Sequence, residues 1–233
     1  MSKLIAGLTD DRGRITIPGF YDDVLEVSPE ERAMLARAPF DEKDFMEGIG
    51  VKALSGETGY SPKERTGIRP SLDVCGIWGG YTGEGAKTVL PSKAYVKIST
   101  RLVPDQDHTK IEKLFKDHLE SIAPASVTVE VSYLHGGQGY VCPVDLPAYR
   151  AAEKAYLDVY GVLPIPVRSG GSIPIISTFE QVLGIKSILM GFGLDSDAIH
   201  SPNENFSLEQ FFNGIRTIPL FYKYFAEMAA PMA

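Results

Sequence analysis

Alternating and helical patterns of apolar residues organise the first half of the chain. Residues 93–101 alternate between apolar and polar side chains, which predicts a strand with Val96 and Ile98 on one face. Asp107 can then cap a helix that carries apolar residues on one side, and residues 127–133 alternate again. Strand, helix and strand with one-sided patterning predict a helix layer on one face of a sheet, an α+β arrangement.

Weaker signals lie before this region. Residues 14–17 alternate and predict a short strand. The sequence Ser-Pro-Glu-Glu at 28–31 has the form of a capping box, so a helix should follow and end near residue 38. Residues 39–75 are polar, rich in Gly and Pro and weakly periodic. They predict an irregular excursion with one short helix near 41–47.

The second half has a different pattern, and the composition changes near residue 137, where we place a domain boundary. A helix is predicted over residues 145–161, which begin with Asp and Pro and end with Gly. The apolar run at 186–192 does not alternate, which predicts a fully buried strand. A last helix begins at Ser207. Helix, buried strand and helix are typical of an α/β domain.

Composition and charge narrow the class of protein. The 233 residues suffice for one large core or two modest ones, and a net charge of -7 argues against a general nucleic-acid binder. No apolar run reaches the roughly 18 residues of a membrane span, and the first apolar stretch is too short for a secretory signal. Cys75 and Cys142 form no CxxC pair, which favours a reducing compartment. We therefore expect a cytoplasmic protein without nucleic-acid or membrane partners.

His200 is the most informative single residue. It follows an apolar run and lies in a polar segment that is typical of a turn. Neutral imidazole is the commonest side-chain metal ligand, and a carboxylate such as Glu204 can orient it. The alternative is a loop histidine whose ring only caps a backbone carbonyl. The other ligands that a metal site needs are not evident in the sequence.

Two further candidate features lie at the two ends of the strand predicted at 93–101. Residues 80–88 nearly spell a phosphate-binding loop, but Ala86 stands where the pattern needs Gly, and a strand follows instead of a helix. A loop between sheet elements is the better interpretation, although Thr88 can still offer a hydroxyl to a ligand. Arg101 ends the strand, where a guanidinium can grip a carboxylate with two hydrogen bonds. The alternative is an exposed strand-end charge.

Two glycine-rich segments are candidate binding loops. Gly171 and Ser172 precede a helical stretch, so their backbone N–H groups can approach an anion, and no base that would make Ser172 a nucleophile is nearby in sequence. A plain connection between loop and helix is the alternative. His135 lies in a second glycine-rich loop at the predicted boundary, where clefts form. A hinge without chemistry explains His135 equally well.

Six segments occur in the order and with the spacing of one known family. They are residues 13–22, 87–91, 99–104, 135–137, 170–174 and 200–204. Together they resemble the M20 metallopeptidases and, within them, the carnosinase-like cytosolic dipeptidases. The resemblance implies a ferredoxin-like lid, or dimerisation, domain over residues 1–137. Residues 138–233 would be the C-terminal portion of an α/β zinc-peptidase catalytic domain.

The resemblance also implies roles for the candidate residues. His200 would be the last ligand of a two-metal centre, usually zinc and sometimes manganese. Arg101 would bind the C-terminal carboxylate of a dipeptide substrate, with Ser172 and Gly171 lining the same pocket. Thr88 would reach the active site of the neighbouring subunit in a homodimer. His135 would lie close to the lid hinge and touch substrate.

The sequence departs from the family pattern in its catalytic groups. The family carries a His-x-Asp motif, a bridging Asp and a Glu-Glu pair with the general base, and no such set is present here. Glu30 and Glu31 belong to the predicted helix start. About three protein ligands are normal for a catalytic zinc. We therefore expect that this chain is the C-terminal portion of a metallodipeptidase and that it is inactive alone. The alternative is a non-catalytic dimerisation or regulatory module.

Overall fold

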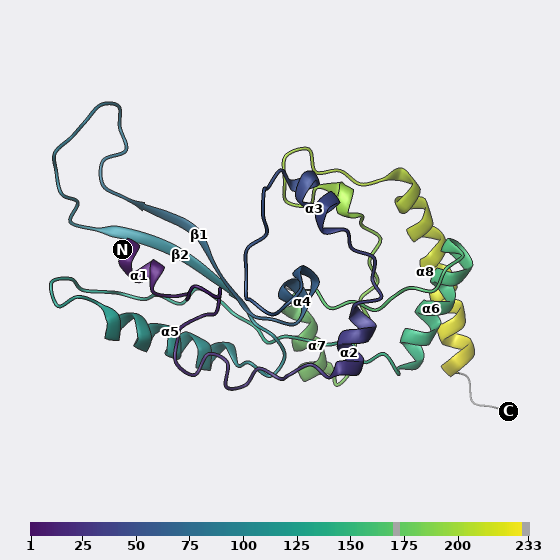
Figure 1. Cartoon of the computed structure of the whole chain (residues 1–233). Helices are drawn as coiled ribbons and strands as arrows, with labels where there is room; N and C mark the ends of the chain where they lie inside the picture. Colours follow the sequence, from purple (N-terminus) through teal and green to yellow (C-terminus); the bar gives the residue numbers. More distant parts are fainter. Residues whose placement is uncertain (170–172, 230–233) are drawn as a thin grey trace. The chain divides into compact units, whose positions relative to one another are not determined.

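The structure of the protein, a computed structural model, describes residues 1–169 and 173–229 (Figure 1). The chain divides into two units, of which the first holds Met1–Tyr140 and Val167–Thr178 and the second holds Val141–Pro166 and Phe179–Ala233. The domain boundary near residue 137 stays a prediction, and no sequence pattern indicated the return of a short segment to the first unit. No helix in the described part of the chain combines the length and apolar character needed to cross a membrane.

A two-stranded antiparallel hairpin is the sheet of the first unit. Strand β1, Ser71–Gly79, pairs with strand β2, Ala94–Arg101, and loop 80–93 joins them. The strand predicted over residues 93–101 is confirmed. Strand β1 was not predicted, because its first residues fall in the segment expected to be irregular.

The hairpin contains an irregularity that sets which side chains face each other. The register shifts between Val74 and Gly76, so β1 has one residue more than the facing stretch of β2. Beyond this shift the rings of Trp78 and Tyr95 lie opposite each other and stack, with centroids 5.3 Å apart.

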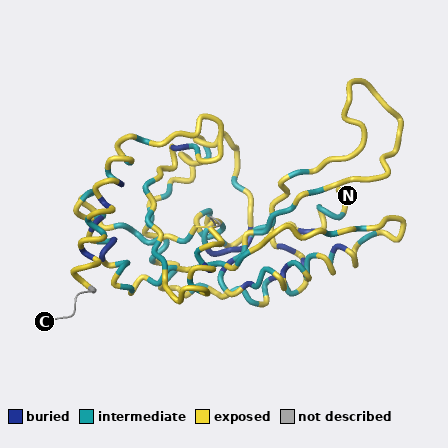
Figure 2. The backbone as a smooth tube through the Cα atoms, turned by 180° about the vertical axis from the view of Figure 1, so that it is seen from behind, coloured by how far each residue is buried: buried dark blue, intermediate teal, exposed yellow. Residues whose placement is uncertain are grey.

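Helix α5, His108–Ile122, covers the core of the first unit (Figures 1 and 2). Its predicted start is confirmed, because the Asp107 carboxylate accepts the backbone N–H groups of Thr109 and Lys110. The buried residues of this core come from the N-terminal segment and from α5; they are Leu8, Ile15, Ile17, Phe20, Ile111 and Leu119. Leu72 and Ile98 of the hairpin pack against them. Each fully buried apolar side chain contributes about 1.5–3 kcal/mol.

Short helices occupy the N-terminal segment and the excursion before the hairpin. They are α1 (Ser2–Ala6), α2 (Pro29–Leu35), α3 (Glu42–Ile49) and α4 (Pro62–Gly67). The predicted starts of α2 and α3 are confirmed, because the side chains of Ser28 and Asp41 each accept a backbone N–H group of the first helical turn. Helix α2 ends at Leu35, earlier than predicted. Helix α4 was not predicted, although Ser61 and Glu64 form a capping box.

A buried ion pair ties this excursion to the start of β1. Glu57 accepts two hydrogen bonds from Arg69, at 2.7 Å from Nε and 2.8 Å from Nη2, and one from Arg14 Nη1 at 3.0 Å. The Arg69 side chain is 4% exposed and that of Glu57 is 9% exposed. Burial opposes the charge on Arg69, but the hydrogen bonds and the charge of Glu57 prevail and raise its pKa.

Two long helices pack together in the second unit. Helix α6, Pro147–Tyr160, and helix α8, Leu208–Ala229, bury Ala151, Ala155 and Tyr224 between them. Gly161 ends α6 in the left-handed conformation, as its position in the sequence predicted. The short helix η1, Asp195–Asp197, lies before α8, and helix α7, Ile175–Leu183, runs from residues of the first unit into the second.

Three predicted strands are wrong. At 14–17 the only pairing is a single bridge between Thr9 and Ile15, because Pro18-Gly19 ends the extended segment at once. Residues 127–133 form no ladder; Val129 and Val131 pack on the α5 core, whereas Val127 and Tyr133 are exposed. Residues 186–192 are not a buried strand, and Leu189 is 56% exposed. The described residues contain no strand beside this segment that would cover its edges.

Candidate functional site

The turn after β2 fixes the position of Arg101. Arg101 is the last residue of β2, lies opposite Ser71 and is exposed. Two residues later the buried Val103 donates its backbone N–H to Gln106 Oε1 at 3.0 Å. Gln106 is 1% exposed, and its Nε2 donates to the Phe20 carbonyl at 2.7 Å. The strand end that carries Arg101 is thus tied to the α5 core by a buried amide that no sequence pattern indicated.

The segment after His135 runs beside this turn. An added Cβ at Gly139 would lie 3.0 Å from the nitrogen of Pro104, and one at Gly137 would lie 2.6 Å from Pro174 Cβ. The segment therefore approaches two other parts of the first unit too closely for side chains, which explains its glycines. His135 itself is exposed and immediately precedes these glycines in the chain.

A second histidine, His108, lies next to the same glycine segment. An added Cβ at Gly136 would lie 2.9 Å from His108 Nδ1, and Tyr133 Oη hydrogen-bonds that nitrogen at 2.8 Å. The two rings stack, with centroids 6.2 Å apart. The His108 ring therefore contacts both Tyr133 and the glycine segment, which no sequence pattern indicated.

The structure brings three of the predicted segments into one region of the first unit. They are the strand end with Arg101, the glycine segment with His135, and Pro174, which follows the candidate loop that contains Gly171 and Ser172. Gly171 and Ser172 of that loop lie outside the described residues. The sequence identified each segment separately, but the close approaches that join them depend on the tertiary fold.

Thr88 lies away from this region. It is exposed in loop 80–93, which projects from the hairpin at the upper left of Figure 1, whereas Arg101 lies at the opposite end of β2. The rise per strand residue is about 3.3 Å, so the seven steps from Ala94 to Arg101 separate the two ends by roughly 23 Å. The loop leads into a strand, as predicted, and so lacks the helix start of a phosphate-binding loop.

His200 belongs to the second unit and lies in a tight turn. It is exposed and has a φ of 61°, in the left-handed region that residues other than glycine seldom adopt. The turn follows Asp197, which is 2% exposed, although its sequence context is that of a surface turn. Within residues 1–169 and 173–229 no three His, Cys, Asp or Glu side chains are grouped to hold a metal ion. The described residues therefore do not form a metal site by themselves.

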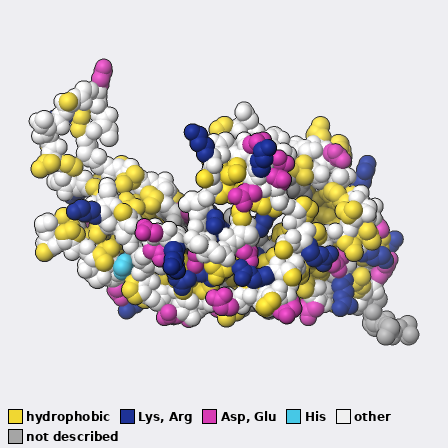
Figure 3. Space-filling view, in the orientation of Figure 1, with side chains coloured by type: hydrophobic (Ala, Val, Ile, Leu, Met, Phe, Trp, Pro, Cys, Tyr) yellow, Lys and Arg dark blue, Asp and Glu magenta, His cyan; other side chains and the backbone are white. Residues whose placement is uncertain are grey.

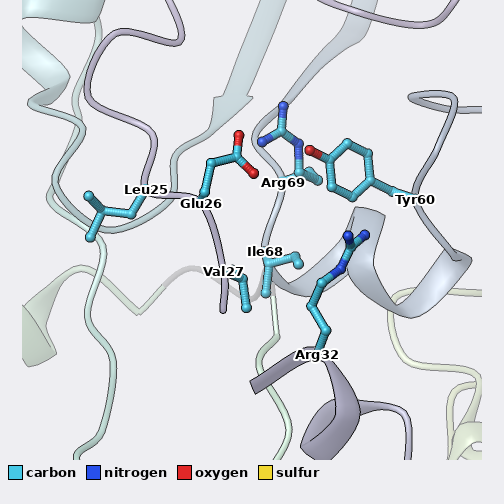
Figure 4. Close-up of a pocket in the computed structure, with 7 residues that line it drawn as sticks. All are labelled: Leu25, Glu26, Val27, Arg32, Tyr60, Ile68 and Arg69. Carbon is cyan, nitrogen blue, oxygen red and sulfur yellow. The ribbon is translucent and has the colours of Figure 1, made fainter. Parts of the chain in front are cut away.

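A shallow pocket elsewhere in the first unit is not part of this region (Figure 4). Tyr60 lies between two arginines, with the guanidinium carbons of Arg69 and Arg32 at 4.4 Å and 5.2 Å from its ring centroid. Each arginine is already paired with a carboxylate, Arg69 with Glu57 and Arg32 with Glu64. The arrangement is a structural network and does not resemble an anion site. Figure 3 shows acidic and basic side chains interspersed on the visible face, without the basic patch of a nucleic-acid binder.

Known proteins match this chain along almost its whole length. Residues 23–223 match the model of Peptidase family M20/M25/M40. The chain is 32% identical to the Cys-Gly metallodipeptidase dug1 of Schizosaccharomyces pombe over 97% of its own length and 48% of that protein. It is 30% identical to the Beta-Ala-His dipeptidase of Homo sapiens, over 97% of its own length and 45% of that protein.

Solved structures agree with this relationship. The fold matches the di-peptidase Dug1p from Saccharomyces cerevisiae with a TM-score of 0.85 and 29% identity, covering 97% of this chain and 48% of that one. It matches human carnosine dipeptidase 1 with a TM-score of 0.83 and 29% identity, covering 96% and 48%. The chain spans about half the length of the curated relatives it matches. The predicted fold class, a mixed α/β part of an M20 peptidase, is confirmed, and the chain belongs to Peptidase family M20/M25/M40.

Proposed function

We propose that this chain is the lid and the C-terminal portion of a dinuclear metal-dependent dipeptidase, and that it is inactive alone. The observation that carries the proposal is the convergence of the Arg101 strand end, the His135 segment and Pro174 in one region of the first unit. The names of the relatives support it, because they include a Cys-Gly metallodipeptidase and a Beta-Ala-His dipeptidase. The substrate class is a small peptide with a free C-terminal carboxylate.

Arg101 is the group that binds this carboxylate. A guanidinium at a strand end offers two parallel N–H donors, and the glycine segment beside it lets substrate backbone approach without side-chain interference. Gly171 and Ser172 complete the same pocket, and His135 contacts substrate at its edge. These roles position the peptide; they do not perform the hydrolysis.

The test of this role is the Arg101→Ala variant in the full-length enzyme. A hydrogen bond to a charged group contributes about 1.5–3 kcal/mol, so kcat/KM should fall roughly 10- to 150-fold, mainly through KM. Lys97→Ala is the matched control, because Lys97 is an exposed cation on the same strand. An unchanged kcat/KM in Arg101→Ala would remove Arg101 from the site.

His200 would supply one ligand to a metal centre of the family type, which holds zinc and sometimes manganese. We propose that the remaining ligands and the general base come from outside the described residues, since no three His, Cys, Asp or Glu side chains are grouped there to hold a metal ion. Metal content and dipeptide hydrolysis should be measured on one purified sample. Turnover with two tightly held metals per chain would refute inactivity of the chain alone.

Thr88 acts in the site of a second copy of the chain, so the functional unit is a homodimer. The roughly 23 Å between the two ends of β2 supports this, because one chain cannot easily offer Thr88 and Arg101 to the same dipeptide. A mixed dimer of full-length Arg101→Ala and full-length Thr88→Ala subunits gives a direct test. If the site combines the two residues across subunits, one site per mixed dimer keeps both and activity returns. If one chain supplies both, every site carries a defect and mixing restores nothing.

A non-catalytic dimerisation or regulatory module remains the second candidate. The lack of a three-ligand metal group among the described residues favours it. Both candidates fit a cytoplasmic setting, since Cys75 and Cys142 are free thiols. Dipeptide turnover by the full-length protein, lost in His200→Ala, separates the enzyme from the module.

A further inference from the structure

The turn that follows Arg101 contains a backbone conformation that needs support. Val103 to Gln106 form a turn in which the Gln106 N–H donates to the Val103 carbonyl at 3.3 Å. Asp105, the third residue of this turn, has a φ of 72°, in the left-handed region that costs free energy for a residue with a Cβ. Such a conformation persists only where surrounding contacts impose it, and one long backbone hydrogen bond is a weak constraint.

The side chain of Gln106 supplies the missing constraint. Its Oε1 accepts the Val103 N–H at 3.0 Å, which closes the turn a second time, and its Nε2 donates to the Phe20 carbonyl at 2.7 Å. All three residues are buried, and Phe20 belongs to the core under α5. Both hydrogen bonds come from the side chain, so a substitution at this position removes both and leaves buried polar groups unpaired.

The same turn is the surface on which the glycine segment packs. A Cβ at Gly139 would lie 3.0 Å from the nitrogen of Pro104 and 3.1 Å from the carbonyl carbon of Val103. Arg101 lies two residues before Val103, and its place in the ladder opposite Ser71 fixes the strand end from the other side. A shift of the turn would therefore change the separation between Arg101 and the glycine segment.

We propose that Gln106 is a positioning residue for the carboxylate end of the substrate. Its side chain holds the turn 103–106 and so keeps Arg101 at the distance from the glycine segment 136–139 that a bound dipeptide requires. The inference rests on the proposed function for the role of Arg101. Gln106 is buried and does not touch the substrate; it acts through Arg101. A displaced guanidinium keeps its charge but loses the alignment that two parallel hydrogen bonds to a carboxylate need.

The first readout is amide hydrogen exchange in the chain itself. Gln106→Met has a side chain of similar length without hydrogen-bonding groups. The Val103 N–H loses its acceptor in this variant, so its exchange should accelerate at least about tenfold more than exchange in α5. Leu119→Ala is the matched control, because it weakens the same core near the far end of α5 and should accelerate both sets of amides alike. Equal acceleration in Gln106→Met would overturn the inference.

The second readout is the preference of the full-length enzyme for a dipeptide over the same dipeptide with an amidated C-terminus, expressed as the ratio of the two kcat/KM values. Partial unfolding of a variant does not change this ratio, because both substrates meet the same amount of folded enzyme. Arg101→Ala should lower the ratio roughly 10- to 150-fold. Gln106→Met should lower it about 3- to 10-fold, the loss of one hydrogen bond, and Leu119→Ala should leave it unchanged.

A double variant, Arg101→Ala with Gln106→Met, shows whether Gln106 acts through Arg101. If it does, the ratio of the double variant equals that of Arg101→Ala alone. An unchanged ratio in Gln106→Met, or a further loss in the double variant, would refute the positioning role. An unchanged ratio in Arg101→Ala would instead overturn the proposed function itself.

A milder variant at the same position keeps the test open if Gln106→Met does not fold. Gln106→Glu retains an oxygen that can accept the Val103 N–H, so it should retain more of the ratio than Gln106→Met. A loss in Gln106→Glu as large as that in Arg101→Ala would contradict the role of the hydrogen bond to Val103.

Discussion

Removal of the buried carboxylate of Glu57 should destabilise the first unit strongly. Glu57→Gln keeps the size of the side chain but removes its charge and turns N–H donors toward the guanidinium groups. Arg69, whose side chain is 4% exposed, would then be an unpaired buried cation. Arg14 is half-exposed and can turn to water, so the loss falls mainly on Arg69.

The magnitude follows from this burial. Breaking a buried ion pair by removing one partner costs about 3–5 kcal/mol, because the remaining charge stays desolvated. For a chain of 150–250 residues each kcal/mol lowers Tm by about 2–4 °C, so Glu57→Gln should lower Tm by roughly 6–20 °C. Replacing both partners, in Glu57→Gln with Arg69→Met, removes the stranded charge and should recover part of this loss.

Thermal unfolding followed by tryptophan fluorescence is a suitable assay, because Trp78, the single tryptophan of the chain, lies in the first unit. Arg32→Gln is the matched control. It breaks a second arginine–glutamate pair, in which the Arg32 side chain is 42% exposed, and the Glu64 carboxylate left behind still accepts the Ser61 N–H, so Tm should fall much less. Equal Tm values for Glu57→Gln and Arg32→Gln would refute the reasoning.

Three further predictions follow from individual contacts. Gly137→Ala should destabilise the chain by about 1–3 kcal/mol in thermal unfolding, because its Cβ meets Pro174 at 2.6 Å. Gly48→Ala, in open space within α3, is the control and should stabilise the chain by about 0.5–1 kcal/mol. The opposite order of stabilities would contradict the close approach at Gly137. Gln106→Leu leaves a buried N–H and a buried carbonyl without their partner and should cost about 2–4 kcal/mol in urea unfolding, and an unchanged midpoint would show that water replaces the amide. Burial raises the pKa of Tyr156 to about 12, with a smaller contribution from Tyr160. The neutral form therefore stabilises the fold fully below pH 10, the unfolded pKa, and this stability is lost between pH 10 and 12. Circular dichroism across that window should show a smaller loss in Tyr156→Phe, and identical profiles would argue against the assignment.

Helix ends were predictable because their signals are local. Ser28, Asp41 and Asp107 cap their helices through contacts within three residues, and Gly161 ends a helix by its own backbone freedom. The same local logic would have found α4, since Ser61 begins a Ser-Pro-Lys-Glu sequence of the same form as the one at 28–31.

Strands were less predictable because pairing is not local. The alternation at Val129 and Val131 correctly indicates that one side of the segment is buried. No strand lies beside them in the described residues, so the segment does not become part of a sheet. The apolar run at 186–192 has the composition of a central strand without the neighbours that would make it one.

The candidate site shows the same limit. Sequence alone selected Arg101, His135 and His200 by residue type and by resemblance. It could not show that Gly139 meets Pro104, because that contact depends on packing between distant parts of the fold.

The register shift in β1 makes one position of the strand dispensable. Val74 faces Ile98 and Ile77 faces Val96, so a spacing of three residues on β1 matches a spacing of two on β2. Cys75 absorbs the difference. A chain that lacked Cys75 would keep every remaining cross-strand pair and form a regular ladder. Strand β1 can therefore lose one residue at this position while each of its other side chains stays on the same face of the hairpin.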